Sequence, residues 1–343
     1  MKYSAWGRTA SCLLAVAGSA LAQQPPAEPA QIFDQPSVLT PAGQLVLEPS
    51  LQYTHSSNMQ VAVEGYTVVP AVLVGLINIS EVQRDTLTAA FALRYGLTRR
   101  LEAELRVPFV YKEESVRERE LFKGSPTDLV RDSSGDGLGD VELALRYQLS
   151  YGGNGWPYTV VNLRVKSRTG EGPFEVAREE LTVEDEDTGA PIPIGEIFRE
   201  QPTGSGFWGV QAGLSFIYPT DPVALFGNVS YLWNVSRRVN AEYGRVDPGD
   251  AVSFGFGMGF AVNERMSFSL GYDHSVVFKT KYQHDPGLDA QFSRFQVGSL
   301  LFGLSHRVGT GNNVSLALAV GVTEYAPDIQ LVLRSPFVLW GRQ

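Results

Sequence analysis

Large apolar side chains alternate strictly with polar or small ones, over about ten residues at a time and many times along the chain. The pattern is clearest in residues 141–149 (VELALRYQL), where every odd position is large and apolar, and residues 87–97 and 101–112 repeat it. Because successive side chains of a strand point to opposite faces, a period of two predicts strands with two unlike faces. This pattern constrains the fold more than any other feature of the sequence.

Later segments keep the large apolar face but fill the other face with small residues. In residues 252–262 (VSFGFGMGFAV) the second face is Ser, Gly or Ala throughout, and residues 314–322 are similar. A soluble β-sandwich would bury its large face and expose charge on the other. Small residues instead suit the inside of a closed barrel, where space is limited.

A membrane protein built from helices is excluded by the length of the apolar stretches. After the first 22 residues the longest is 68–77, which contains Pro70 and Gly75. It is about half of the roughly 20 residues that a spanning helix needs. A soluble β-sandwich and an outer-membrane β-barrel remain.

The pattern predicts an all-β fold, an antiparallel transmembrane β-barrel of about twelve strands, with fourteen as the alternative. The count is even, as in bacterial single-chain barrels. The predicted strands are 44–56, 86–98, 101–113, 138–150, 157–168, 206–218, 222–236, 250–262, 265–280, 294–308, 313–323 and 328–340.

The connections fall into two classes, as outer-membrane barrels require. Every even-numbered strand is followed by a short link, and odd-numbered strands are mostly followed by long ones. The long links are 57–85, 114–137, 169–205, 237–249 and 281–293. A sandwich does not explain this parity. Aromatic residues on the apolar face also gather near both strand ends, which favours two membrane–water interfaces. They are Tyr95, Tyr147, Tyr218 and Phe260 near the short links, and Tyr53, Tyr111, Trp208, Trp233 and Tyr325 near the long ones.

The chain begins with a predicted signal peptide. Residues 1–22 combine two early basic residues, a short apolar run and Ala-Leu-Ala before Gln23. Residues 23–43 are Pro-rich and form a predicted periplasmic lead-in, and residues 44–343 form the barrel. A net charge of −9 argues against nucleic acid as the partner, and the single Cys12 excludes an internal disulfide. We therefore expect export to the outer membrane of a Gram-negative bacterium.

Three segments resemble a known family. They are Leu39-Thr40-Pro41 leading to Leu47-Glu48-Pro49-Ser50-Leu51, then Arg94-Tyr95-Gly96-Leu97-Thr98, and then Gly137-Leu138-Gly139-Asp140-Val141-Glu142-Leu143. They are similar to the outer-membrane transporter family named for the meta pathway of phenol degradation, over most of the chain from about residue 34. The resemblance implies an outer-membrane channel for aromatic or other hydrophobic compounds. We expect no cofactor.

Charged residues on the inward face of neighbouring strands are the main candidate site. They form a predicted pore-lining ladder of Glu48, Arg94, Glu104, Arg106, Glu142, Arg146, Arg164 and Lys166. Facing rows of opposite charge create a transverse field that filters ions and solutes. The alternative is that these groups pair with one another and fill the barrel.

A metal site is a weaker candidate. Oxygen-bearing side chains at Asp132, Ser134, Asp136 and Asp140 follow the spacing of a calcium loop, with Gly137 at the turn. The distal Glu that completes such loops is missing. The alternative, which we favour, is a polar loop entering the next strand, so we expect no metal.

An enzyme is a further alternative. His55 and Ser57 share the outward face of the first strand, as in outer-membrane lipid hydrolases, where a His base activates a Ser. The sequence shows no partner that would orient His55. We therefore expect no catalytic residues.

These observations predict a passive channel for uptake or efflux of small, hydrophobic or aromatic molecules, lying among outer-membrane lipid and lipopolysaccharide. Cargo would enter through loops 57–85 and 169–205. The main alternative is a non-conducting barrel, plugged by residues 23–43 or 60–79, that acts as a surface or secretion partner.

Overall fold

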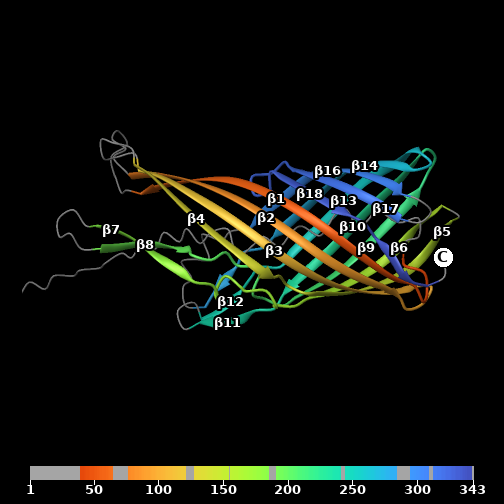
Figure 1. Ribbon diagram of the computed structural model, residues 1–343, viewed down its shortest axis with the longest axis horizontal. Coiled ribbons are helices and arrows are strands. Elements are labelled where there is room, and N and C mark those ends of the chain that lie inside the picture. Colours follow the sequence, from red (N-terminus) through yellow and green to blue (C-terminus); the bar gives the residue numbers. More distant parts are fainter. Residues whose placement is uncertain are drawn as a thin grey trace, which may run out of the picture.

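The computed structural model describes residues 39–64, 76–120, 127–153, 155–184, 191–240, 244–283, 294–308 and 312–341. The predicted signal peptide and most of the Pro-rich lead-in lie outside these ranges. Among the described residues, no helix is long and apolar enough to cross a membrane. Figure 1 shows a barrel of tilted strands, several of which extend beyond it at one end.

Within the described ranges, twelve antiparallel strands close into a barrel, because β18 pairs with β1. The prediction of a twelve-stranded antiparallel barrel is therefore confirmed. The barrel strands are β1 (Leu45–Glu64), β2 (Leu76–Gly96), β3 (Leu101–Glu120), β5 (Glu142–Gly153), β6 (Trp156–Lys166), β9 (Gly209–Pro219), β10 (Val223–Asn234), β13 (Ala251–Asn263), β14 (Met266–Val277), β16 (Phe295–Val308), β17 (Asn312–Gly321) and β18 (Ile329–Arg334).

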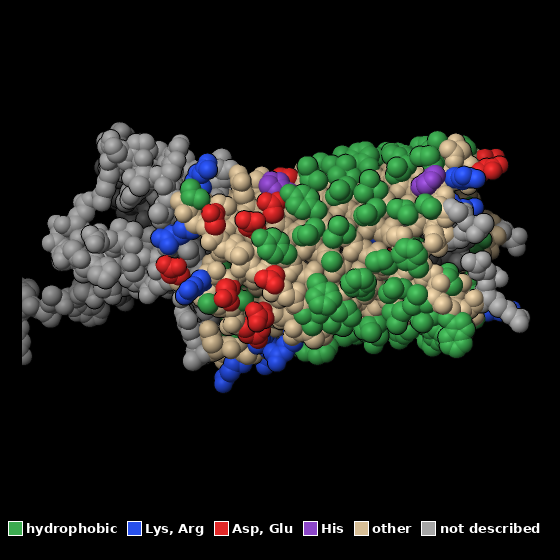
Figure 2. Space-filling model, in the orientation of Figure 1, with side chains coloured by type: hydrophobic (Ala, Val, Ile, Leu, Met, Phe, Trp, Pro, Cys, Tyr) green, Lys and Arg blue, Asp and Glu red, His purple; other side chains and the backbone are tan. Residues whose placement is uncertain are grey.

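The predicted alternation sets the two faces of the wall. On β5, Leu143, Leu145 and Tyr147 are exposed on the outside, whereas Ala144 and Gln148 are buried on the inside. Exposed apolar side chains cover the barrel as a continuous band in Figure 2, with charged side chains gathered beyond it. Such a band matches the hydrocarbon core of a membrane. All nine aromatic residues predicted for the two girdles are exposed.

Two of the predicted loops are mostly strand, which corrects the prediction. The segments 57–85 and 114–137 extend β1, β2 and β3 well beyond the barrel, with pairing continuing to Glu64↔Leu76 and Asn78↔Glu120. Beyond a membrane both faces of a strand meet water, so the apolar alternation no longer marks the strand. The described parts of residues 60–79 belong to this extended hairpin, and the rest lie outside the described residues.

Two barrel positions are each shared by two strands. β4 (Thr127–Leu138) precedes β5 along β3, and β19 (Phe337–Trp340) follows β18 along β1. The predicted strands 138–150 and 328–340 are therefore interrupted, the second at Ser335-Pro336. Proline has no N–H to donate, and Pro336 lies near Pro49 of β1, since the Ser335 N–H donates to the Pro49 carbonyl (3.2 Å).

The two ends of the barrel differ. At the short-turn end, the chain enters through residues 39–44, and the Thr40 N–H donates to Glu102 inside the barrel (2.6 Å). At the long-loop end, β7 (Arg178–Glu184) pairs with β8 (Pro191–Phe198). β11 (Arg237–Asn240), β12 (Gly244–Asp247) and β15 (Lys281–Tyr282) form a small sheet there.

Candidate pore

The inside of the barrel has two unlike walls. The inward positions of β1, β2, β3, β5 and β6 are rich in charged side chains, which we call the charged wall. The inward positions of β9, β10, β13, β14, β16 and β17 are mostly Gly, Ala and Ser, which we call the small-residue wall. The short side chains of the small-residue wall therefore leave more space beside them than the long side chains of the charged wall.

All eight residues of the predicted ladder lie on the charged wall, and each takes part in an ion pair. Arg94 pairs with Glu48. Arg146 is the centre of the largest group, because it contacts Glu102 and Glu104 at 2.7 Å each. Most ladder residues therefore pair with one another, as the alternative predicted, while Lys166 pairs with Asp140 and Arg146 also with Glu102, outside the ladder.

Nearer the long-loop end the ladder is looser. Arg106 and Arg164 share Glu142 at 3.8 and 3.5 Å. Lys166 lies 3.2 Å from Asp140. The Asp140 carboxylate also accepts hydrogen bonds from the Ser205 N–H (2.9 Å) and hydroxyl (2.7 Å), so it ties the chain after β8 to the barrel.

The sequence did not single out several groups on this wall. Arg84 and Glu114 form a buried ion pair, with Arg84 Nε 2.7 Å from the carboxylate. Residues 199–207, which were predicted as the end of a loop (to 205) and the start of a strand (from 206), fold back onto the inner side of the wall, and β9 begins only at Gly209. There the buried Gln201 donates to Glu114 and to Ser133. No strand pattern marks this segment, so only the three-dimensional structure reveals it.

A cavity of about 180 Å³ lies inside the barrel toward the long-loop end. We call it the outer cavity. Segment 199–207 and the charged wall border it on one side, and Val297 and Gln330 on the other. Four basic and two acidic side chains line it, which makes its surface net positive. They are Arg84, Arg106, Lys112, Lys166, Asp140 and Glu142.

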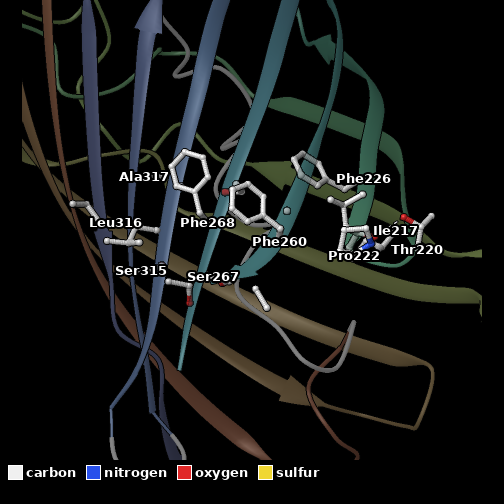
Figure 3. A pocket seen from close by; sticks show the side chains of 18 residues that line it. Ile217, Thr220, Pro222, Phe226, Phe260, Ser267, Phe268, Ser315, Leu316 and Ala317 are labelled. Carbon is white, nitrogen blue, oxygen red and sulfur yellow. Dashed lines mark hydrogen bonds between the residues drawn. The ribbon is translucent and has the colours of Figure 1, made fainter. Parts of the chain in front are cut away.

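A second cavity of about 350 Å³ lies at the short-turn end and is called the inner cavity. It is bordered by the small-residue wall, and the labels in Figure 3 run from Ile217 and Thr220 to Ser315 and Ala317. No charged side chain lines it among the described residues. The lumen therefore offers a charged cavity at one end and a mostly apolar one at the other.

Phe226 is one of three phenylalanines that border the inner cavity (Figure 3). The end of its ring lies over Gly257, the residue opposite it on β13. A Cβ at Gly257 would collide with the ring and with the Leu270 carbonyl oxygen. Glycine at this position therefore leaves room for both the ring and the backbone of the next strand.

The calcium-loop candidate has a different backbone from the one it requires. Asp132, Ser134 and Asp136 belong to β4, an extended strand paired with β3, and Asp140 turns inward to Lys166. Ligands on one face of an extended strand do not converge on one ion as those of a loop do. In the described part of the chain, no three His, Cys, Asp or Glu side chains group as a metal site.

His55 has a partner that the sequence did not reveal. Asp85 stands opposite it on β2, with Oδ1 2.8 Å from His55 Nδ1. The Ser57 hydroxyl, however, donates to Asp328 (2.7 Å). A hydroxyl has one proton to donate, so Ser57 makes no donor bond to His55, and the nucleophile–base bond of a hydrolase is missing.

No protein-family model matches the sequence, so the named family remains a prediction. Among solved structures, an outer-membrane channel from Pseudomonas putida F1 has 14% identity and a TM-score of 0.55, over 89% of this chain and 99% of that one. The Ralstonia pickettii toluene transporter TbuX has 11% identity and a TM-score of 0.43, over 87% and 90%. The CymD monoaromatic hydrocarbon channel has 11% and 0.42, over 88% and 90%. The first similarity shows that this chain has the fold of an outer-membrane barrel.

Proposed function

We propose that the chain is a passive outer-membrane channel for small molecules with largely apolar bodies. The observation that carries this is the lumen itself, which holds a cavity at each end and a wall of small residues along one side. The fold, shared with an outer-membrane channel, supports the same reading.

The proposal includes location and surroundings. The lipid-facing band and its aromatic girdles fit an outer membrane, with the long-loop end outside the cell and lipopolysaccharide around it. Residues 1–22 would direct export. Cargo would enter beside segment 199–207, pass the outer cavity and leave through the inner cavity.

A pair of tryptophan variants tests the proposal. Ala317 faces the inner cavity, whereas Leu333 of the neighbouring β18 is exposed on the outside of the barrel and borders neither cavity. Ala317→Trp should fill part of the cavity, and Leu333→Trp places the same side chain in lipid. The assay is entry of radiolabelled toluene into intact cells of a strain that lacks the gene, with each form supplied.

We expect the wild type and Leu333→Trp to raise the entry rate and Ala317→Trp to leave it near that of the deletion strain. Equal rates with and without the wild-type gene would contradict the proposal. So would Ala317→Trp transporting as fast as the wild type while present in the membrane in equal amount.

A further inference from the structure

The small-residue wall carries one feature that transport of plain hydrocarbons does not explain. Asp273 of β14 points inward and is only 3% exposed. Within the described residues its carboxylate forms no hydrogen bond or ion pair, whereas every acidic residue of the ladder is paired. Burial of an unpaired carboxylate is costly, so a hydrogen-bond donor that reached it would be bound favourably.

Asn228 stands close to Asp273 across a glycine. The two lie on β10 and β14, in register with Gly255 of β13 between them. A Cβ at Gly255 would stand 2.8 Å from Asn228 Nδ2 and 2.8 Å from Asp273 Oδ1. The Asn228 amide, which can donate or accept a hydrogen bond, and the Asp273 carboxylate, which accepts one, therefore lie on either side of Gly255. A side chain at position 255 would fill the space between them.

An apolar surface adjoins this polar pair. Phe226 is the next inward residue on β10, and its ring covers Gly257, the next inward residue on β13. A molecule whose polar group reached Asp273 would thus lay its apolar body against the face of Phe226. Aromatic faces pack well with flat apolar groups.

The pair lies between the two cavities. Along β16, Val297 borders the outer cavity, whereas Gly303 and Ser305 border the inner one. Ser299, which pairs with Asp273, falls between these positions. A molecule that moves along this wall from one cavity to the other therefore passes Asp273.

We propose that Asn228 and Asp273, straddling Gly255 beside Phe226, form a selectivity site for cargo with a hydrogen-bond donor at one end of a small apolar body. The donor is a hydroxyl or an ammonium group, which the carboxylate accepts, and the body packs on Phe226. This inference rests on the proposed function and narrows its substrate class.

The test is block of ionic current through the refolded full chain in a planar bilayer. The added probes are benzyl alcohol and benzylamine, which carry a donor, and toluene, which has the same ring and none. Wild-type channels should be blocked by a donor-bearing probe at a concentration at least about tenfold lower than by toluene, as expected for a hydrogen bond to a carboxylate. Asp273→Leu, close in size, should remove this difference and leave block by toluene unchanged.

Two further variants guard against a misfolded barrel. Asn228→Leu should weaken block by the same probes, and Ser299→Ala, in the same row, should leave it as in the wild type. Whichever donor responds identifies the group that the site accepts. Equal block by all three probes in the wild type, or unchanged block in Asp273→Leu, would overturn the inference. Channels that conduct but are blocked equally by all three probes would overturn this inference and leave the proposed function intact. A refolded chain that never conducts would contradict the proposed function itself.

Discussion

Removal of the Arg146 guanidinium should destabilise the barrel strongly. Arg146 contacts Glu102 and Glu104 at 2.7 Å each, and these residues are only 1% and 6% exposed. Arg146→Met would remove the cation that both buried carboxylates contact. Breaking a buried pair from one side costs about 3–5 kcal/mol. We expect a loss near 3 kcal/mol, because the lumen lets some water reach the group.

The assay is guanidinium unfolding of the refolded barrel in lipid vesicles, followed by tryptophan fluorescence. Arg99→Met, in an exposed turn, is the matched control and should change the free energy of unfolding little. A triple variant that adds Glu102→Gln and Glu104→Gln should recover most of the loss, since neutral amides can replace the network. A loss below about 1 kcal/mol in Arg146→Met, or a triple variant less stable than the single one, would refute the reasoning.

Three more predictions follow from the lumen and the wall. Met258→Arg, on the lipid-facing side of β13, should cost about 2–4 kcal/mol in vesicles, and a cost near zero would deny that this face meets lipid. Arg106→Ala should lower the preference for anions that the net-positive outer cavity creates, which the reversal potential in a salt gradient measures, and an unchanged potential would mean that ions avoid this wall. Phe226→Ala should widen the inner cavity and raise single-channel conductance, and equal conductance would show that this ring does not limit the flow of ions.

The barrel could be predicted from the sequence because membrane and lumen demand different side chains at alternate positions. In residues 141–149 this demand fixes which side each residue faces, and the predicted strands agree with the structure to within a few residues along most of the wall. Outside the membrane the lipid-facing positions no longer need apolar side chains. The extensions of β1 to Glu64 and of β3 to Glu120 were therefore predicted as loops.

The candidate site was predicted only in part, for two physical reasons. Alternation places Arg106 and Glu142 inside the barrel, but their pairing depends on strand register, which single strands do not encode. The same holds for Asp85 beside His55, and for Asn228 and Asp273 across Gly255. Segment 199–207 has no periodicity, so its inward fold follows from tertiary contacts such as that of Gln201 with Glu114.

Single-channel recording of the refolded chain in a planar bilayer tests whether this barrel is a channel. The lumen predicts discrete conductance steps in the wild type and in Leu333→Trp, and much smaller steps or none in Ala317→Trp, whose indole would occupy the inner cavity of about 350 Å³. A wild-type barrel that is folded, as judged by its β-structure, and yet silent would contradict the account. Steps of full size in Ala317→Trp would contradict the route through the inner cavity.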